Sequence, residues 1–510
     1  MKNQTYSIVI VSSEFSPFAK TGGLGDMVAA LAAGLKRKGH DVRVVLPLYS
    51  QIRESPVELH TALPSMCVTM GIGEVWCAVR YTVTSEKVPL YFIEHEDFYH
   101  RTGLYHDEQY RDYPYNPLRF GFCCKAALQL IIDLDLTPDI VQVNDWQTAL
   151  VPAYLKTWFS NHPSLCQCAS ILTIHNAPYQ GIFPASHYRW LGLPSHDLLP
   201  DIFEDYGRIN FLKGGIHFAD VVNTVSPTYA REMKTSVGGH GLVPTITKKG
   251  ERFQGILNGV DYDTWSPDKD RFLPARYSIA DMSGKINCKI HLQRQFHLEE
   301  DSCIALIGFI GRFSDQKGLY LLKEVIERVV DDMVVQVVIL GSGDPQLEQY
   351  FGRLPARYPG KIGAYIGFHD EMAHLIEAGA DFFVMPSLYE PCGLNQMYSL
   401  RYGTLPIVRA TGGLDDTIEN YDEATGNGTG FKFWDNTSNA LYYTVGWAVS
   451  TYYDRPDHMR MLREKAMKQD FGWNRSIIEY ERLFTMAIEL KNKRSVGPSA
   501  LSDLNTSPQT

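Results

Sequence analysis

The stretch from Lys20 to Asp26 reads Lys-Thr-Gly-Gly-Leu-Gly-Asp and joins an apolar run, Tyr6 to Val11, to a helix-like run, Met27 to Lys38. A short apolar strand, a glycine-rich turn and a helix in this order are typical of an α/β fold. Glycine lets the backbone approach a ligand closely at a helix N-terminus, where free N–H groups attract phosphate. Lys20 adds a cation and Asp26 a hydrogen-bond acceptor, so the stretch suits a sugar joined to a diphosphate.

The glycines of this stretch, Gly22 and Gly23 among them, also fit a plain strand-to-helix turn. Neither common nucleotide fingerprint is present. The Gly-x-Gly-x-x-Gly motif needs a different spacing, and a P-loop ends in Gly-Lys-Ser or Gly-Lys-Thr. A functional interpretation therefore depends on partner residues elsewhere in the chain.

Composition and charge limit the class of protein. The chain has 510 residues, of which 45% are hydrophobic and 21% charged, as in ordinary globular proteins. This length predicts about two to four domains. The net charge of -10 argues against nucleic acid as the main partner, whereas a neutral polymer is compatible with it.

The start of the chain lacks a signal-peptide pattern, and no stretch reaches the roughly 18 apolar residues that a membrane helix needs. We therefore expect a cytoplasmic protein without a membrane partner. The nine cysteines are scattered and lack paired Cys-x-x-Cys spacing. This pattern predicts free thiols, no disulfide framework and no structural metal.

Short β-branched runs alternate with helical stretches in both halves of the chain, which is the signature of parallel sheets covered by helices on both faces. In the first half the expected strands are 7–11, 42–46, 90–93, 140–143, 170–174 and 221–224. After a polar, proline-bearing stretch the alternation resumes, and the expected strands are 305–310, 335–340, 363–367, 382–385 and 405–408.

We therefore predict an α/β protein with two Rossmann-like domains, residues 1–255 and 256–472, that face each other across a deep cleft. Residues 473–490 carry apolar side chains at helical spacing, so a helix over 473–492 must pack on another element. Residues 493–510 have few apolar anchors and are predicted to be a disordered tail.

A second candidate phosphate site follows the expected strand 305–310. Arg312 can hold two phosphate oxygens with its planar fork, and Lys317 supplies a point charge on a flexible stem. Two cations on one short loop suggest a diphosphate, although such a pair is also common on solvated loops.

A third cluster follows the expected strand 382–385. Glu390 would accept hydrogen bonds from sugar hydroxyls, and the residues after it would offer backbone N–H groups to phosphate or sugar. A simple helix cap is the alternative. The candidates for these backbone groups are Cys392, Gly393 and Leu394, with Thr411 and Gly412 on the next glycine turn.

In the first half, two further strands end in polar residues. Asp145 follows the strand 140–143, and His175 follows the strand 170–174. A lone histidine at a strand end is more often structural, but this one lies in the same layer as Lys20.

Aromatic side chains alternate with polar ones between Phe98 and Phe122. Flat rings flanked by hydrogen-bonding groups suit a glucan chain, although such loops also pack on their own domain. Tyr113 and Asn116 are the candidates for glucan contacts.

Taken together, these motifs resemble the glycogen and starch synthase family of retaining glycosyltransferases, its bacterial glycogen synthases in particular. The likeness spans roughly residues 6–490 in the family's order. The residues that carry it are Lys20 to Asp26, His175-Asn176, Ser226 to Ala230, Leu257 to Asp261, Arg312 to Gly318, Glu390 to Leu394 and Thr411 to Leu414.

The resemblance implies a GT-B fold, a final helix that returns to the first domain, and transfer of glucose from ADP-glucose to the nonreducing end of an α-1,4-glucan. It implies no metal or other cofactor, and UDP-glucose is the alternative donor. The implied catalytic residues are Glu390, His175, Arg312 and Lys317. The implied substrate-binding residues are Lys20, Gly22, Gly23, Asp26, Asp145, Asn258, Cys392, Gly393, Leu394, Thr411, Gly412, Tyr113 and Asn116.

Two positions depart from the family's pattern. Gln147 stands where many relatives have His, and Phe368 where a Tyr often lies near the nucleobase. A sucrose or trehalose phosphate synthase would lack the Lys20 to Asp26 stretch, and a glucan phosphorylase would need a pyridoxal cofactor. A noncatalytic glucan-binding scaffold derived from a synthase stays open, and so does the oligomeric state.

Overall fold

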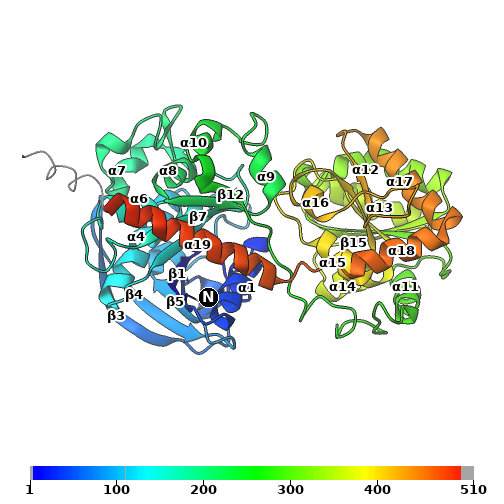
Figure 1. Cartoon of the computed structure of the whole chain (residues 1–510), viewed down its shortest axis with the longest axis horizontal. Helices are drawn as coiled ribbons and strands as arrows, with labels where there is room; N and C mark the ends of the chain where they lie inside the picture. The colour runs from blue at the N-terminus through cyan, green and yellow to red at the C-terminus, as the bar shows by residue number, and fades with distance from the viewer. Residues whose placement is uncertain (1–3, 110, 496–510) are drawn as a thin grey trace, which may run out of the picture. The chain divides into compact units, whose positions relative to one another are not determined.

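The computed structural model describes residues 4–109 and 111–495. These residues form two compact units, each with its own sheet (Figure 1). Unit 1 contains residues 4–225, 230–256 and 473–495, and unit 2 contains residues 226–229 and 257–472. The short segment 226–229 therefore belongs to unit 2, although the domain boundary expected from the sequence lies at residue 255.

The main sheet of unit 1 has the strand order β12-β11-β7-β6-β1-β2-β5-β4-β3. The strands from β12 to β5 are parallel, whereas β4 is antiparallel to both β5 and β3. The bounds are β1 (Ser7–Val11), β2 (Asp41–Pro47), β3 (His60–Met70), β4 (Gly73–Val83), β5 (Pro89–Glu94), β6 (Ile140–Asn144), β7 (Ala169–Ile174), β11 (Val221–Thr224) and β12 (Phe253–Gly255).

The six strands expected in the first half all lie in this sheet and run parallel to one another, as predicted. The hairpin β3–β4 adds an antiparallel edge, whose half-exposed strands alternate buried and exposed residues. Continuous apolar runs predict strands that are buried on both faces, and such an edge hairpin does not have them. A small antiparallel sheet was also not expected; it contains β8 (Ile182–Pro184), β10 (Arg208–Asn210) and β9 (Glu204–Asp205).

Helices cover the sheet of unit 1. Their bounds are α1 (Gly23–Arg37), α2 (Ser50–Arg53), α3 (Glu96–Tyr99), α4 (Asn116–Asp133), α5 (Asp145–Thr148), α6 (Val151–Lys156), α7 (Tyr188–Leu191), α8 (Phe211–Phe218), α10 (Val243–Thr247) and α19 (Trp473–Ser495). A further short helix, α9 (Pro227–Glu232), begins within the 226–229 segment.

The last helix, α19, packs on α1, β7 and β11 of unit 1 (Figure 1). Its apolar stripe is buried there, and polar pairs fix it at one side. The Tyr6 hydroxyl lies 2.8 Å from Thr485 Oγ1, and His40 Nε2 lies 3.0 Å from Glu481 Oε1. The helix ends at Ser495 and so includes the first three residues of the expected tail; residues 496–510 lie outside the described part of the chain.

The sheet of unit 2 is parallel throughout, in the order β15-β14-β13-β16-β17-β18. Its strands are β13 (Ala305–Ile310), β14 (Val335–Gly341), β15 (Ile362–Ile366), β16 (Phe382–Met385), β17 (Leu405–Arg409) and β18 (Phe431–Phe433). Its helices are α11 (Ser283–Gln295), α12 (Leu319–Asp332), α13 (Pro345–Arg357), α14 (Asp370–Gly379), α15 (Asn395–Tyr402), α16 (Gly412–Thr417), α17 (Ser438–Asp454) and α18 (Pro456–Met467).

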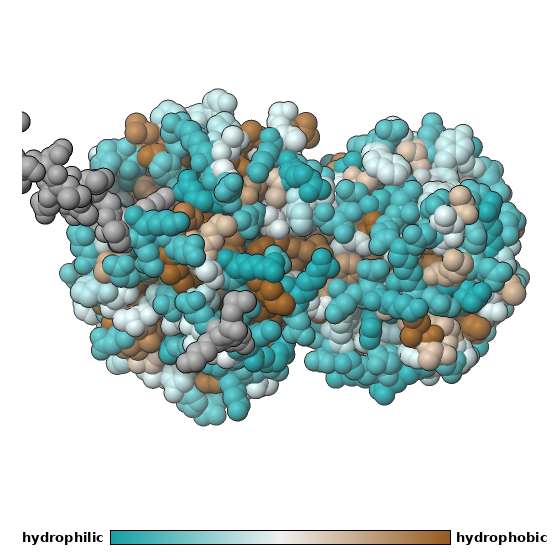
Figure 2. All heavy atoms as spheres, in the orientation of Figure 1, coloured by the Kyte–Doolittle hydropathy of each residue, from teal (hydrophilic) through white to brown (hydrophobic). Residues whose placement is uncertain are grey.

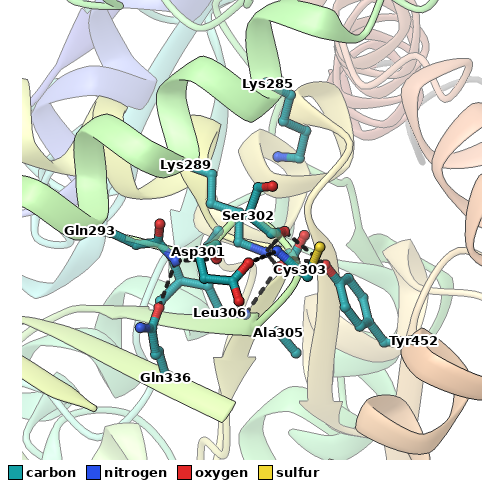
Figure 3. Close-up of polar contacts among 12 residues, drawn as sticks. Lys285, Lys289, Gln293, Asp301, Ser302, Cys303, Ala305, Leu306, Gln336 and Tyr452 are labelled. Carbon is teal, nitrogen blue, oxygen red and sulfur yellow. Dashed lines mark hydrogen bonds and ion pairs between the residues drawn. The ribbon is translucent and has the colours of Figure 1, made fainter. Parts of the chain in front are cut away.

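A buried ion network ties α11 to the sheet of unit 2, and Figure 3 shows its Lys289 beside Ser302 and Tyr452. Lys289 Nζ donates to Asp381 Oδ2 at 2.6 Å, to the Ser302 carbonyl at 2.9 Å and to the Tyr452 hydroxyl at 3.2 Å. Arg463 holds the other oxygen of Asp381 at 2.7 Å. Burial alone would raise the pKa of Asp381, but the two cations hold that pKa below its usual range. The charges are therefore paired and hydrogen-bonded, as buried charges must be.

The face of unit 2 that Figure 2 shows is mostly hydrophilic, with hydrophobic residues scattered singly over it. The apolar side chains of the sheet strands lie in the interior instead. Among the described residues, no helix is both long and apolar enough to cross a membrane.

Candidate active site

The carboxyl ends of parallel strands meet at one edge of a sheet, and three candidate loops of unit 2 lie at this edge. The Arg312 loop (residues 311–318) follows β13, and the Glu390 loop (residues 386–394) follows β16. The turn with Thr411 and Gly412 follows β17. Because β13, β16 and β17 are neighbours in the sheet, the topology brings these loops together.

An ion pair joins the first two loops. Lys317 Nζ donates to Glu390 Oε2 at 2.6 Å, and Ser387 Oγ donates to the same oxygen at 3.0 Å. The Glu390 side chain is only 7% exposed, whereas that of Lys317 is 26% exposed. A buried carboxylate thus faces a cation that still reaches solvent, in a position set by the two loops.

Two glycines allow the loops to approach this closely. Gly318 has φ +67°, and a Cβ there would lie 1.8 Å from the Pro386 carbonyl oxygen. Gly412 has φ +45°, and a Cβ there would lie 2.0 Å from the Glu390 carbonyl oxygen. Both positions therefore need glycine for conformation and for space.

Backbone groups surround Glu390. Leu394 is the N-cap of α15 and makes no side-chain hydrogen bond there, so its side chain does not occupy the N–H groups at the start of the helix. Gly393 has φ +71° and precedes this cap. Cys392 is buried, and burial raises the pKa of its thiol to about 12, so the thiol stays protonated. Thr411 caps α16 in the same way.

The two remaining candidates of unit 2 lie nearby in different settings. Arg312 is exposed on its loop next to the end of β13. Asn258 is buried, and its Oδ1 has no hydrogen-bond partner among the described residues. An unpartnered buried acceptor is costly unless a ligand or water satisfies it, which is consistent with a binding role for Asn258.

In unit 1, the stretch from Lys20 to Asp26, called the glycine loop below, leads into α1. Lys20 Nζ lies 2.6 Å from Asp26 Oδ2, and both side chains are about half exposed. Gly22 is the N-cap of α1 in an extended conformation that any residue can adopt. A Cβ at Gly22 or Gly23 would meet no atom within 4 Å. The fold therefore does not need glycine at these positions, which favours a close approach by a ligand over a purely structural turn.

His175 and Asp145 lie together at the ends of β7 and β6. The His175 backbone N–H donates to Asp145 Oδ1 at 2.7 Å. The ring atom Nε2 lies 3.1 Å from Asn144 Oδ1, an atom that can only accept, so Nε2 carries the proton and Nδ1 is an acceptor. Burial lowers the pKa of His175 to about 3 and raises the pKa of Asp145 to about 7. His175 is therefore neutral at physiological pH.

The two glucan candidates are tied into unit 1. Asn116 is buried, its Nδ2 donates to the Tyr105 carbonyl at 2.8 Å, and its Oδ1 accepts from Arg119 at 2.6 Å. The guanidinium groups of Arg101 and Arg119 lie 5.0 and 5.1 Å from the centre of the Tyr113 ring. A glucan role for either residue stays a prediction, and their internal contacts give them a clear structural role.

Sequence reasoning missed two residues that hold the candidate loops. Arg409 donates from Nε to the Ser387 carbonyl at 2.8 Å and from Nη2 to the Leu388 carbonyl, so it clamps the Glu390 loop. Glu14 is 3% exposed and binds the glycine loop in unit 1. Both lie just at or beyond the end of a strand, β17 or β1, which is the signal that singled out Asp145.

The positions that depart from the family's pattern have defined places. Gln147 is buried, and its Oε1 has no partner among the described residues. Phe368 is 85% exposed, beyond the end of β15. Within the described residues, no group of three or more His, Cys, Asp or Glu side chains could hold a metal ion, and the absence of a metal stays a prediction.

Two α/β units with charged and glycine-rich loops at the carboxyl edges of their parallel strands define the class: a two-domain glycosyltransferase of the GT-B type. The family described as starch synthase catalytic domain matches residues 7–248, and the family described as glycosyl transferases group 1 matches residues 294–467. Glycogen synthase 1 of Geobacter sulfurreducens is 46% identical over 96% of this chain and 98% of its own length. The chain belongs to the glycogen synthase family.

Further relatives support the same family. Glycogen synthase of Thermotoga maritima is 40% identical over 94% of this chain and 99% of its own length. The catalytic domain of starch synthase IV from Arabidopsis thaliana, solved with ADP and acarbose, has a TM-score of 0.87 at 33% identity and covers 95% of this chain and 100% of its own. A sucrose-phosphate synthase from Thermosynechococcus elongatus, with a TM-score of 0.59 at 16% identity, shares the fold.

Proposed function

We propose that this protein transfers glucose from ADP-glucose to the nonreducing end of an α-1,4-glucan, with retention of configuration at the anomeric carbon. Membership of the glycogen synthase family supports the activity, and the Arabidopsis relative was solved with ADP and acarbose. The observation that carries the proposal in this chain is the Lys317–Glu390 pair, a cation and a buried carboxylate at one sheet edge.

In unit 2, Arg312 and Lys317 bind the diphosphate and stabilise the negative charge that grows on it as the sugar bond breaks. Preorganised charges of this kind contribute roughly 10² to 10³ in rate per donor. Glu390 accepts hydrogen bonds from glucose hydroxyls. The remaining contacts come from Asn258 and from backbone groups at Cys392, Gly393, Leu394, Thr411 and Gly412.

The candidate residues of unit 1 serve the same reaction in this proposal. Lys20 and the amides of Gly22 and Gly23 bind the diphosphate, and Asp26 supports them. His175 is neutral, so it contributes a hydrogen bond to the sugar rather than a charge. Asp145 holds the backbone of His175, and Tyr113 and Asn116 line the path of the glucan.

Retention is explained by attack on the same face from which the diphosphate leaves. The bond between the anomeric carbon and the phosphate oxygen breaks, and a bond to the acceptor O4 forms. The proton of the acceptor hydroxyl passes to the departing phosphate, so charge and protons balance. The position eight residues after Glu390 is Tyr398, whose ring stacks on that of Trp265 with centres 4.0 Å apart, so this position offers no second carboxylate.

The donor is tested by supplying radiolabelled ADP-glucose and UDP-glucose separately with glycogen and measuring the label in the polymer. Transfer from ADP-glucose at several times the rate with UDP-glucose is expected. Faster transfer from UDP-glucose would show that the donor is UDP-glucose, while the proposed glucosyltransferase activity would stand. No transfer from either donor would favour the noncatalytic scaffold, although the charges of the site argue against it.

A further inference from the structure

Glu14 connects two parts of unit 1 that the proposed function uses separately. It lies after β1, its side chain is buried, and its two carboxylate oxygens receive three hydrogen bonds. The Thr21 backbone N–H donates to Oε2 at 2.8 Å, and the Thr21 hydroxyl donates to Oε1 at 2.6 Å. The third donor is the Tyr105 hydroxyl, at 2.7 Å from Oε1.

The first two bonds fix the glycine loop at its second residue, next to Lys20. Backbone bonds hold the segment just before the loop, since Phe15 and Ala19 exchange two bonds at 2.8 and 2.9 Å. At Thr21, the carboxylate of a residue outside the loop holds the loop. The position of Lys20 and of the Gly22 and Gly23 amides thus depends on the Glu14 carboxylate.

The third bond reaches the segment that contains the glucan candidates. The single phenolic proton of Tyr105 goes to Glu14, so the Ser13 hydroxyl donates to Tyr105 at 2.8 Å. The Tyr105 carbonyl accepts from Asn116 Nδ2 at 2.8 Å and from the Tyr113 backbone N–H at 3.2 Å. Glu14 is therefore linked to the glycine loop through Thr21 and to both candidates through Tyr105, whose hydroxyl bonds Glu14 and whose carbonyl bonds the candidates.

The backbone of Glu14 is also held. Ser12 Oγ donates to the Glu14 carbonyl at 2.8 Å and accepts from the Glu14 N–H at 3.2 Å. A carboxylate with a fixed backbone and three donors has little freedom to move without displacing them. Such buried polar networks are strongly coupled, because losing one member leaves the others unsatisfied.

We propose that Glu14 is a positioning residue that couples the glycine loop to the segment carrying Tyr113 and Asn116, so that donor binding and acceptor binding depend on each other. The inference rests on the proposed function of these two regions. Glu14 itself touches neither substrate. Its role is to hold the donor side and the acceptor side in one arrangement.

Three variants test the bonds of Glu14 to the glycine loop and to Tyr105 separately. Thr21→Val removes the hydroxyl bond on the glycine-loop side, and Tyr105→Phe removes the bond on the glucan side. Glu14→Gln keeps the size of the side chain but replaces one acceptor with a donor. Initial rates are measured with ADP-glucose varied at fixed glycogen and with glycogen varied at fixed ADP-glucose.

We expect Thr21→Val to raise the KM for ADP-glucose and Tyr105→Phe to raise the KM for glycogen, each by several fold. Glu14→Gln should raise both and lower kcat by about tenfold, the size expected for coupled contacts. The double variant Thr21→Val with Tyr105→Phe should be non-additive, because both changes break the same network. This double variant tests the coupling even where Glu14→Gln folds poorly.

Asp220 provides a matched control for a merely structural carboxylate. It is 1% exposed and accepts hydrogen bonds from the Ser170 N–H and hydroxyl, away from the candidate residues. Asp220→Asn should lower the melting temperature and leave both KM values unchanged.

Additive effects in the double variant, or Glu14→Gln kinetics that follow those of Asp220→Asn, would overturn the coupling. Absence of glucose transfer by the wild type would instead refute the proposed function, so failure of the coupling and failure of the proposed function are distinguishable.

Discussion

At the residue scale, the carboxyl of Asp145 links stability to pH. Burial raises its pKa from 3.8 to about 7, although the His175 N–H favours the charged form. Below about pH 4 the carboxyl is neutral in both states and its contribution is fully present. As the pH rises toward 7, the unfolded chain loses the proton while the folded chain keeps it, so stability falls.

Asp145→Asn should remove this loss. Asparagine cannot ionise, and its Oδ1 still accepts from the His175 N–H. The free energy of unfolding of the variant should therefore rise relative to that of the wild type between about pH 4 and pH 7, as measured by urea denaturation. His175 stays neutral in the folded protein in this range, and its titration in the unfolded chain is common to both proteins, so it does not obscure the difference. A difference that stays constant with pH would contradict the assignment.

At the element scale, a substitution at the start of α1 can distinguish an effect on stability from an effect on ligand binding. Gly23 is the first residue of the helix, and a Cβ there would meet nothing within 4 Å. Alanine is a better helix former than glycine by up to about 1 kcal/mol, so Gly23→Ala should not destabilise the protein. The added methyl group would occupy the space in which we place the diphosphate.

We therefore expect Gly23→Ala to keep or raise the melting temperature while lowering kcat/KM for ADP-glucose by about tenfold or more. Gly39→Ala is a useful contrast, because Gly39 has φ +94° and lies after α1, away from the glycine loop. Gly39→Ala should lower the melting temperature and leave kcat/KM for ADP-glucose unchanged. Wild-type kinetics for Gly23→Ala would remove these amides from the proposed site.

The elements also show what sequence could and could not predict. Strands such as β11 and β13 are continuous apolar runs, and their expected bounds agree with the structure to the residue. Strands β3 and β4 were missed because an edge hairpin has one open face and no such run. Glu14 was missed for another reason: its role depends on Tyr105, which is distant in the chain and brought near only by the fold.

At the scale of the whole molecule, each of the two units carries candidate residues of its own, and the pair that carries the proposal lies within unit 2. The Lys317–Glu390 contact spans 73 residues and needs β13 beside the strand β16, an order that the alternation of strands and helices does not specify. Sequence motifs named both residues, since each follows an apolar strand. Their pairing, and the clamp by Arg409, required the structure.

The central claim is that the Lys317–Glu390 site performs glucosyl transfer. The most direct measurement is incorporation of labelled glucose from ADP-glucose into glycogen by the wild type, Lys317→Ala and Glu390→Ala. The surface pair Arg294–Glu300 supplies the control Glu300→Gln. Circular dichroism and melting temperatures establish that each variant is folded.

We predict that the wild type and Glu300→Gln incorporate label at similar rates, whereas Lys317→Ala and Glu390→Ala fall by roughly 10² to 10³. Wild-type-like incorporation by either folded site variant would contradict the account.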